Sequence, residues 1–328
     1  MTAVILENSK GLTVDKESSL TVVRRRDLIP GKIVELRLSN SRGEKIPSWE
    51  PGAHIELTLP SGIVRQYSLC GDPSDDFYTI AVLREDNSRG GSIEVHDEIQ
   101  EGTELMVRGP KNHFKLVPGN LTVFMAGGIG ITPLLPMMRL LSKQGKPWVL
   151  HYGGKSLAAL AYLDALQLME DNEISIYLKN ETRRIPVSDI VSTLSTDDAI
   201  YVCGPESMIS EVEKVGAESG IRVCLERFGP APGDKPEING ESFEVELARS
   251  AKVLTVPADT RLIDIVRTVV PSVPFSCEEG YCGSCETGVL EGVPDHRDSI
   301  LSPQEKSNND CMMICVGRSM TPRLVLDI

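Results

Sequence analysis

A group of cysteines near the C-terminus constrains this chain more than any other feature. Cys277, Cys282 and Cys285 follow the pattern C-x4-C-x2-C in PFSCEEGYCGSCETGVLEG, and Cys315 lies further along the chain. This spacing is that of plant-type [2Fe–2S] clusters, which are held by four thiolates. Such a site needs one tight loop and one distant cysteine that the fold brings beside it. The sequence therefore predicts an iron–sulfur domain over residues 241–328.

The alternatives to a cluster are a zinc site and a set of buried thiols. The paired C-x2-C motifs that are usual for zinc are absent. The N-terminal segment lacks the basic start and long apolar stretch of a secretory signal, so a disulfide framework is not expected. We expect Gly280 and Gly283 to let the loop wrap closely, so that backbone N–H groups point at the sulfur atoms.

Two cysteines compete for the fourth ligand position. Cys315 lies in the apolar segment MMICV, which we predict to be a strand, and its separation from Cys285 is that of plant-type ferredoxins. Cys311 follows the polar stretch SNND, where we expect an exposed thiol. The sequence therefore favours Cys315.

Length and charge exclude several classes of protein. The chain has 328 residues and a net charge of −13, so two or three domains are expected, and a nucleic-acid partner is not. No run of about 18 apolar residues occurs, which predicts a protein without a membrane span. Residues 241–328 carry 14 acidic and 8 basic residues. We predict that Glu278, Glu279 and Glu286 form an acidic docking face there for a basic protein partner.

The hydrophobic pattern divides the chain into three domains. Residues 1–116 contain short alternating segments separated by Gly, Pro and Asp, which predict an antiparallel β-barrel. Residues 117–228 alternate strand-like and helical segments, which predict a parallel sheet with helices on both faces. A helix is expected over 133–145, with Thr132 as its N-cap and Pro133 as its first residue. The Pro- and Gly-rich residues 229–240 are interpreted as a linker before the last domain.

A candidate phosphate site lies in the predicted barrel. Arg65-Gln66-Tyr67-Ser68-Leu69 occupies one strand, and Arg89-Gly90-Gly91-Ser92 follows about twenty residues later. An arginine, a Gly-rich turn and a serine hydroxyl can together bind a phosphate. By itself, RQYS also fits an ordinary strand with one aromatic residue.

Two candidate nucleotide-binding segments lie at the ends of predicted strands in the α/β region. GGIGITP over 127–133 can bring backbone N–H groups close to a pyrophosphate, although it does not match GxGxxG and also suits a structural turn. CGPESM begins at Cys203, at the sheet edge where ligands bind in such folds. A small buried residue is the alternative interpretation of Cys203.

Taken in order, RQYSL, RGGS, GGIGITP, VCGPESM, LERF and C-x4-C-x2-C resemble the phthalate dioxygenase reductase family, which includes vanillate demethylase reductases. The resemblance covers the chain from about residue 20 to its end. It implies a multidomain fold: an FMN-binding antiparallel β-barrel, an NAD-binding parallel-sheet α/β domain and a β-grasp ferredoxin domain. It also implies a monomeric cytoplasmic enzyme that acts with a Rieske-type oxygenase.

The resemblance also assigns residues. Arg65 and Ser92 would hold the FMN phosphate, with Gln66, Arg89, Gly90 and Gly91 nearby. Tyr67, Ser68, Ala81, Val82 and Leu83 would border the flavin ring, and Thr132 and Phe228 would approach it from the nucleotide side. Gly128, Gly130, Cys203, Gly204 and Met208 would bind NADH. Ser68, Cys203 and Phe228 are the candidate catalytic residues, and Cys277, Cys282, Cys285 and Cys315 the iron ligands.

The implied parts suggest an electron path. A nicotinamide releases two electrons as hydride, a [2Fe–2S] cluster accepts one at a time, and a flavin can do both. The expected order is therefore NADH, FMN, cluster and oxygenase. Gln66 stands where relatives often have Thr, and Lys155 where many have Arg, which leaves the phosphate contacts and the choice of NADH or NADPH open. An FAD-containing reductase of the same domain order and a non-catalytic redox sensor are the alternatives.

Overall fold

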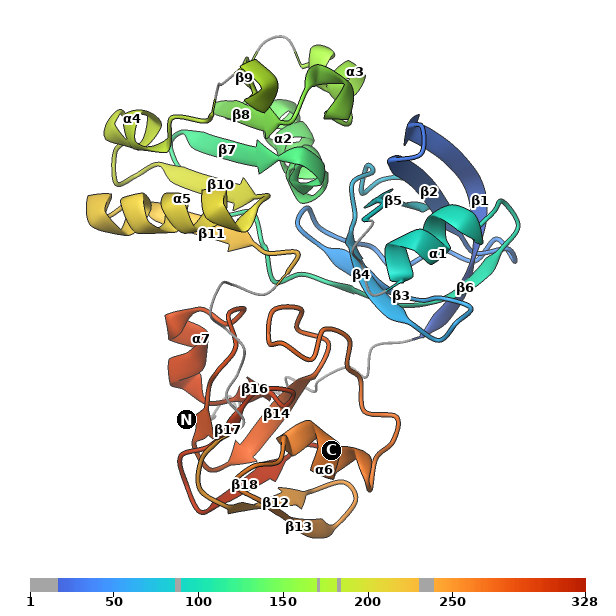
Figure 1. The fold of residues 1–328 in the computed structure, drawn as a ribbon, viewed down its shortest axis with the longest axis vertical. Coiled ribbons are helices and arrows are strands. Elements are labelled where there is room, and N and C mark those ends of the chain that lie inside the picture. The colour runs from blue at the N-terminus through green and yellow to red at the C-terminus, as the bar shows by residue number, and fades with distance from the viewer. Residues whose placement is uncertain (1–16, 86–89, 170–171, 182–183, 230–238) are drawn as a thin grey trace, which may run out of the picture.

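The computed structural model describes residues 17–85, 90–169, 172–181, 184–229 and 239–328. Its three large sheets form three lobes, one for each predicted segment of the chain (Figure 1). Most of the predicted linker and Arg89 lie outside the described residues. In the described ranges, no helix is long and apolar enough to cross a membrane.

The first lobe is a six-stranded antiparallel sheet in the order β4-β3-β6-β1-β2-β5. The Cys70 N–H donates to the Thr79 carbonyl, so the ends of the edge strands β4 and β5 meet and the sheet curls into a barrel. Alternate side chains fill its interior, as the period-two pattern predicts. The elements are β1 (Ser18–Ile29), β2 (Ile33–Ser39), β3 (His54–Thr58), β4 (Val64–Ser68), β5 (Tyr78–Leu83), α1 (Gly91–Asp97) and β6 (Glu104–Lys111).

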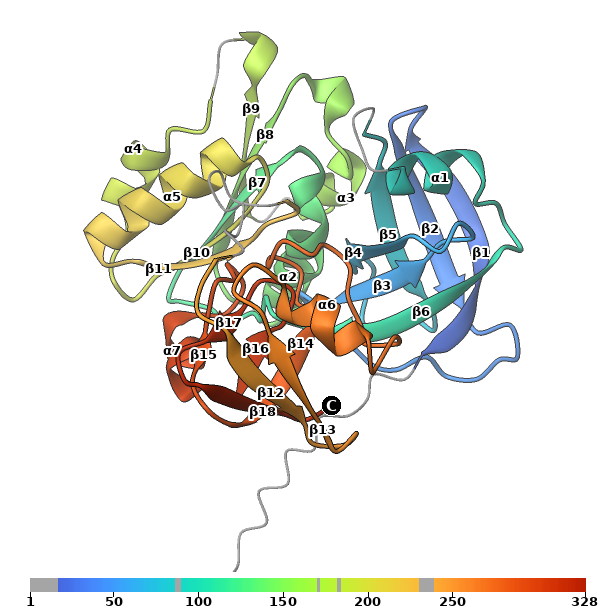
Figure 2. The ribbon, with the colours of Figure 1, turned by 60° about the horizontal axis from the view of Figure 1, so that its bottom comes forward.

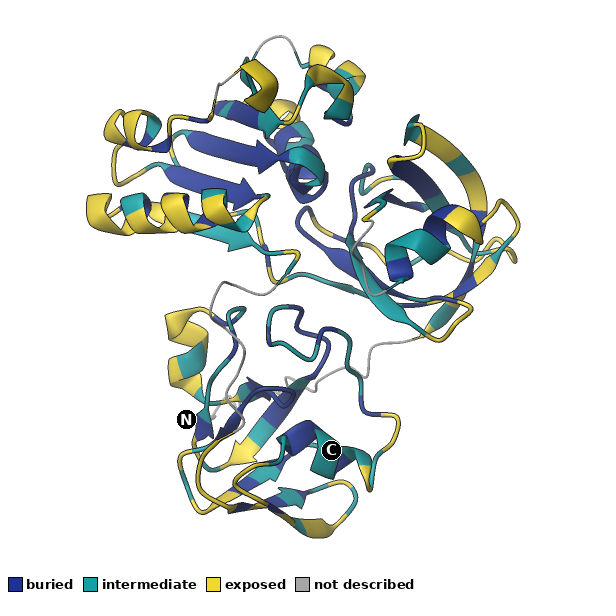
Figure 3. Ribbon diagram, in the orientation of Figure 1, coloured by how far each residue is buried: buried dark blue, intermediate teal, exposed yellow. Residues whose placement is uncertain are grey.

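The second lobe is a five-stranded parallel sheet in the order β11-β10-β7-β8-β9. Its central strands are buried, with α2 and α3 on one face and α4 and α5 on the other (Figures 1 and 3). The elements are β7 (Thr122–Gly127), η1 (Gly128–Gly130), α2 (Ile131–Lys143), β8 (Trp148–Gly154), η2 (Leu157–Ala159), α3 (Leu163–Gln167), β9 (Glu173–Leu178), η3 (Lys179–Glu181), α4 (Val187–Ser192), β10 (Ala199–Cys203), α5 (Glu206–Ser219) and β11 (Arg222–Glu226).

The start of α2 differs from the prediction. A 3-10 turn over Gly128–Gly130 runs directly into the helix, so Gly130 is the N-cap and Ile131 is the first helical residue. Thr132 therefore lies inside the first turn, where its hydroxyl donates to the Ile129 carbonyl. The predicted N-cap was wrong because the sequence does not reveal this preceding turn.

The third lobe is a mixed five-stranded sheet in the order β13-β12-β18-β14-β16, with α6 packed against it. β12 and β18 are parallel and their neighbours antiparallel, which is the expected β-grasp arrangement. The elements are β12 (Phe243–Leu247), β13 (Lys252–Val256), α6 (Leu262–Arg267), β14 (Glu286–Glu291), β15 (Pro294–Asp295), α7 (Pro303–Asn308), β16 (Cys311–Met313), β17 (Arg318–Ser319) and β18 (Arg323–Leu326).

A shared hydrophobic core joins the first two lobes, whereas the third lobe has a core of its own. One core contains Ile33 and Ala81 of the barrel together with Leu134 and Tyr152 of the parallel-sheet lobe. The core of the third lobe contains only residues from Phe243 onward. Hydrogen bonds attach this lobe to the barrel, including one from Ser276 Oγ to the Val64 carbonyl at 3.2 Å. The loops of the third lobe lie against the other two lobes in both views (Figures 1 and 2).

Candidate functional site

Cysteine thiols gather at the end of the third lobe that faces the barrel. Cys277, Cys282 and Cys285 lie in the loop before β14, and all three are buried. Cys315 lies in the turn after β16 and not inside a strand as predicted, because β16 ends at Met313. The pairing of Glu286 with Met313 then brings that turn beside the loop.

The four thiols interact with one another in pairs. Cys277 Sγ interacts with the thiols of Cys282 and Cys315, and Cys315 interacts with Cys285. Across the described residues, no three His, Cys, Asp or Glu side chains converge on a single ion. A two-iron cluster does not require such a point, because each iron takes two of the four cysteine sulfurs and shares the bridging sulfides. The paired thiols fit a [2Fe–2S] cluster better than a mononuclear zinc.

Backbone N–H groups point at these sulfurs, as the sequence predicts. The Glu279 N–H donates to Cys277 Sγ at 3.3 Å, and the Cys277 N–H donates to Cys282 Sγ at 3.4 Å. Both loop glycines have positive φ, 75° at Gly280 and 77° at Gly283. A side chain at Gly283 would meet the His113 ring, so the loop approaches the segment that follows the barrel closely enough to require glycine.

Cys311 lies apart from this group. It is the first residue of β16 and is half-buried, not exposed as predicted. Burial and the carboxylates of Glu286 and Asp310 raise the pKa of its thiol to about 12. A thiol held protonated beside two carboxylates is a poor metal ligand.

Two of the three acidic residues predicted to form a docking face contact other side chains of this chain. Glu278 pairs with Arg261, with Oε2 and Nη1 2.5 Å apart. Glu286 faces His113, with Oε2 and Nε2 3.5 Å apart. All three predicted glutamates, including Glu279, are half-buried. Glu278 and Glu286 are therefore occupied within the chain, where the sequence could not place their partners.

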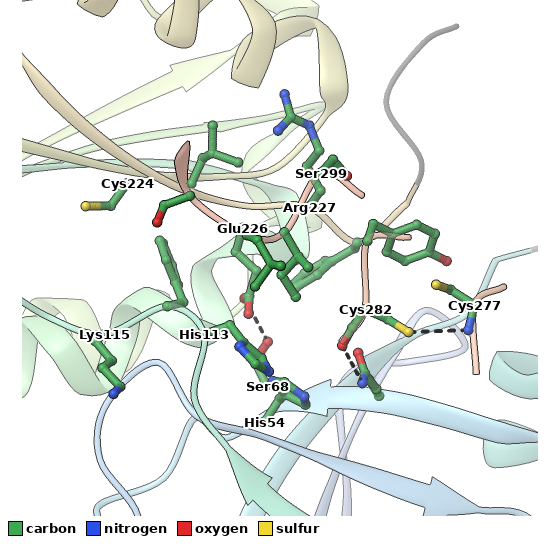
Figure 4. Close-up of a pocket in the computed structure, with 18 of the residues that line it drawn as sticks. His54, Ser68, His113, Lys115, Cys224, Glu226, Arg227, Cys277, Cys282 and Ser299 are labelled. Atoms are coloured by element: carbon green, nitrogen blue, oxygen red, sulfur yellow. Dashed lines mark hydrogen bonds between the residues drawn. The ribbon is translucent and has the colours of Figure 1, made fainter. Parts of the chain in front are cut away.

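A cavity of about 460 Å³ lies where the three lobes meet (Figure 4). Its volume is typical of a site for a small molecule or cofactor. The buried Nε2 of His54 has no hydrogen-bond partner, although it lies in this cavity's wall. Burial lowers the pKa of His54 to about 3, so the ring is neutral and this nitrogen is available to a polar ligand group. The residues that contribute to the wall include Arg65, Gln66, Tyr67 and Ser68 of β4, Glu226 at the end of β11, Arg227 and Phe228 just after it, and Cys277, Tyr281 and Cys282 of the cysteine loop.

The candidate phosphate residues lie side by side. A side chain at Gly91 would strike the Arg65 guanidinium, so a glycine is needed for Arg65 to lie over the start of α1. The Ser92 hydroxyl accepts from the Glu85 N–H at 3.2 Å, which places it in the same turn. This cradle fits a phosphate group. Gln66 differs from the prediction, since its amide points toward the third lobe.

The candidate residues on β5 do not share one face. Ala81 and Leu83 pack toward the parallel-sheet lobe, whereas Val82 is buried in the barrel core. The alternation of strand side chains makes this unavoidable. The side chain of Val82 is therefore turned away from any ligand shared with Ala81 and Leu83, and none of the three lines the cavity.

Ser68 forms the most unusual polar contact in the cavity. Its hydroxyl donates to Glu226 Oε2 at 3.2 Å, which links β4 to the end of β11 (Figure 4). Partial burial at the junction of the lobes raises the pKa of Glu226 to about 8. The carboxyl therefore holds a proton at neutral pH and can exchange it near that pH. Sequence reasoning quoted the LERF segment but missed this residue; an acidic residue ending a sheet strand was the available signal.

The glycines after β7 serve two different purposes. At Gly130, a Cβ atom would overlap the carbonyl of Cys203, so this glycine lets η1 pack on the end of β10. At Gly128, φ is 55° and a Cβ atom would meet nothing within 4 Å. Gly128 therefore borders open space of the kind a pyrophosphate needs, whereas Gly130 is explained by packing alone.

We expect Gly130→Ala and Gly128→Ala to fail in different ways. Gly130 has φ −62°, which suits alanine, so only the clash with Cys203 acts, and it should cost about 1–3 kcal/mol. The melting temperature of the Gly130→Ala variant should fall by several degrees. Gly128→Ala meets no neighbouring atom but adds about 1 kcal/mol of left-handed strain at φ 55°, so its melting temperature should fall less than that of Gly130→Ala, whereas its affinity for NADH should fall more. Equal losses of stability without any change in nucleotide affinity would show that both positions are structural.

The remaining nucleotide-site candidates lie around the end of β10. Cys203 is completely buried, and burial raises the pKa of its thiol well above the usual range. Gly204 approaches the Gly127 backbone and the Met208 side chain too closely for any other residue. Phe228 is 46% exposed and lies in the cavity wall. The structure thus gathers Cys203, Gly204 and Met208 with the β7 glycines, and Phe228 with Ser68.

Comparison with known proteins decides the family. Residues 124–214 match the oxidoreductase NAD-binding domain, and residues 245–319 match the 2Fe-2S iron-sulfur cluster binding domain. The phenoxybenzoate dioxygenase subunit beta of Ectopseudomonas oleovorans is 41% identical, over 85% of this chain and 88% of that protein. The crystal structure of phthalate dioxygenase reductase is 32% identical with a TM-score of 0.67, over 95% of this chain and 98% of that one. The chain belongs to the phthalate dioxygenase reductase family.

Members of this family include reductases of oxygenase systems, and this chain is an oxidoreductase with an NAD-binding domain and a [2Fe–2S] domain. The fold also occurs inside a larger enzyme. An intact type IV self-sufficient cytochrome P450 monooxygenase matches with a TM-score of 0.88 and 33% identity, over 95% of this chain. This chain spans only 41% of that protein. The expected fold class and family are thereby confirmed.

Proposed function

We propose that this reductase passes electrons from NADH through FMN and the [2Fe–2S] cluster to a Rieske-type oxygenase. One observation supports the proposal above all others. A single cavity is lined by the β4 segment Arg65–Ser68, by Glu226 and Phe228 of the nucleotide lobe, and by two of the four clustered cysteines. A flavin placed there would contact both the donor and the acceptor domain.

The residues of the chain fit these groups at separate places. Arg65, Gly91 and Ser92 would hold the FMN phosphate, and Tyr67 and Ser68 would border the ring, together with the neutral His54. Gly128 and the end of β10 would hold NADH. Cys277, Cys282, Cys285 and Cys315 would hold the irons. When bound, the flavin supplies the conversion between a two-electron hydride donor and a one-electron acceptor.

Ser68 and Glu226 supply the proton chemistry in this proposal. Glu226 holds its proton at Oε at neutral pH, and Ser68 Oγ lies 3.2 Å away on the cavity side. The hydroxyl can relay a proton between the carboxyl group and a ligand atom in the cavity. Glu226 is half-buried in the cavity wall, so the carboxyl group lies within reach of a ligand placed there.

The function is tested by turnover with purified components. We expect the purified chain to reduce an artificial acceptor rapidly with NADH, and to support turnover of a purified Rieske-type oxygenase. A chain that carries the cluster but reduces no acceptor would be a redox sensor and not a reductase. Release of the flavin and chromatography against FMN and FAD standards decides which flavin is bound.

NADH should be preferred over NADPH by at least tenfold in kcat/KM. The expected 2′-phosphate site offers no arginine pair among the described residues. It does hold two exposed lysines, Lys155 and Lys179, drawn together by the hydrogen bond from the Asn180 N–H to the Lys155 carbonyl. Lys155→Ala should leave kcat/KM for NADH within about twofold. The lysines would instead bind the 2′-phosphate if the wild-type kcat/KM were equal for NADH and NADPH and if Lys155→Ala lost activity with NADPH alone.

Phe228 is proposed to cover the flavin ring until the nicotinamide arrives. It follows β11, borders the cavity and keeps 46% of its surface exposed, so little packing holds it in place. Phe228→Ala should change the rate of flavin reduction or the nucleotide preference severalfold, and change the melting temperature by less than about 2 °C. Normal reduction kinetics with lowered stability would assign Phe228 to packing.

We also propose the domain limits 1–116, 117–228 and 241–328, and a monomeric cytoplasmic enzyme. The described cysteines are all free thiols, which suits a reducing compartment. Sedimentation of the purified chain measures its oligomeric state directly.

A further inference from the structure

Gln66 makes a contact that its place in the flavin strand does not explain. It lies on β4 between Arg65 and Tyr67, yet its side chain crosses to the cysteine loop of the third lobe. Nε2 lies 2.7 Å from the Cys282 carbonyl and 2.9 Å from Ser284 Oγ. Glu56 Oε1 lies 3.2 Å away within the barrel, but the two hydrogens on Nε2 are taken by the two shorter contacts, with the Cys282 carbonyl and Ser284 Oγ.

Ser284 connects this amide to a sulfur of the proposed cluster. Ser284 is buried, with 1% of its surface exposed, and its Oγ lies 3.4 Å from Cys282 Sγ. As a thiol, Cys282 can donate its hydrogen to Ser284. As a deprotonated iron ligand it has no hydrogen to give, so any hydrogen bond between them must run from the serine hydroxyl to the sulfur.

The direction of the Gln66 contact favours that arrangement. The amide N–H groups can only donate, so Ser284 Oγ accepts from Gln66 and keeps its own hydrogen for a second partner. Cys282 Sγ is the acceptor within reach. A hydrogen bond to a cluster sulfur stabilises the reduced, more negative state and so raises the reduction potential.

We propose that Gln66 is a positioning residue that orients the Ser284 hydroxyl toward Cys282 Sγ, so that docking of the cluster domain on the flavin barrel raises the cluster's reduction potential. Gln66 belongs to the barrel, whereas Ser284 and Cys282 belong to the third lobe. This support exists only while the two lobes are in contact. This role of Gln66 rests on the proposed assignment of the four cysteines to the cluster.

The consequence concerns the direction of electron flow. With the lobes docked, the raised potential favours reduction of the cluster by the flavin. When the third lobe separates to meet its acceptor protein, Ser284 loses its partner and the potential falls. The electron then leaves the cluster more readily. The interface suits such separation, because the core of the third lobe contains no barrel residue.

Redox-poised EPR of the full-length reductase tests this proposal without any measurement of turnover. The wild-type chain is first brought to the potential at which half of its clusters are reduced. At that potential, Gln66→Met should lower the ratio of reduced to oxidised cluster about tenfold, which is 59 mV for a one-electron couple. Ser284→Ala should lower it by a similar factor, and the double variant should show no further change.

Ser276→Ala is the matched control. It also removes one hydrogen bond between the third lobe and β4, but its hydroxyl bonds the Val64 carbonyl and not Ser284. Its ratio should stay within twofold of wild type. Gln66→Thr, whose side chain is too short to reach Ser284, repeats the test if Gln66→Met does not fold.

Three results would overturn the proposal: an unchanged ratio in the Gln66 variants, additive shifts in the double variant, or an equal shift in Ser276→Ala. The wild-type spectrum tests the cysteine assignment separately. Its two-iron signal must be present before any variant is compared, so the cluster assignment and the role of Gln66 can fail independently.

Discussion

Cys315→Ser is expected to abolish the visible absorption and the EPR signal of the cluster while NADH still reduces the flavin. Cys315 is the member of the group that comes from outside the loop, and its thiol interacts with those of Cys277 and Cys285. Serine oxygen is a much poorer ligand for iron than a thiolate. Electron transfer to the protein acceptor should fall at least 100-fold, because the flavin loses its one-electron outlet.

Cys311→Ser is the matched control, four residues away. Cys311 lies near Glu286 and Asp310 and not near the other thiols, so both the cluster and the flavin reduction rate should be unchanged. Loss of the cluster in the Cys311 variant, together with its retention in the Cys315 variant, would mean that the turn after β16 is wrongly placed.

Glu226→Gln should remove a pH-dependent cost of folding. Burial raises the pKa of Glu226 to about 8 in the folded chain, against an ordinary value of 4.5. Between these values the folded chain keeps a proton that the unfolded chain has released, so wild-type stability falls as pH rises from 4.5 to 8 and then levels off. The cost above pH 8 is at most about 5 kcal/mol. The melting-temperature gain of Glu226→Gln over wild type should therefore be larger at pH 8.5 than at pH 5.

The same substitution should slow the chemistry. A glutamine side chain at this position cannot hold or release a proton, so flavin reduction by NADH should fall 10- to 100-fold and lose its dependence on pH near 8. Glu218→Gln makes the same chemical change at an exposed position of α5 and should alter neither property. A Glu226 variant with wild-type rates, or with an equal stability difference at both pH values, would remove Glu226 from the proposed proton path.

These two tests concern residues that sequence reasoning reached in different ways. Cys315 was selected by its separation from Cys285, although the strand predicted around it is a turn. Glu226 was not selected, because its importance depends on its place at the junction of the lobes and on Ser68, which is 158 residues away in the chain. A residue's spacing within a motif can be read from the chain, whereas its burial by another domain cannot.

The order of the three domains, the cysteine pattern and the family could be read from the sequence alone. Each of these depends on local spacing: period-two alternation for the barrel, alternating strands and helices for the parallel sheet, and C-x4-C-x2-C for the loop. Which side chains meet was set by the tertiary structure. It pairs Glu278 with Arg261 within the third lobe and places Glu286 beside His113 of the barrel segment. It also turned Gln66 from the flavin strand toward Cys282 and Ser284. The contacts of Glu286 and Gln66 depend on how separate domains pack, and hydrogen bonds between residues more than 200 positions apart leave no periodic or spacing signal in a single sequence.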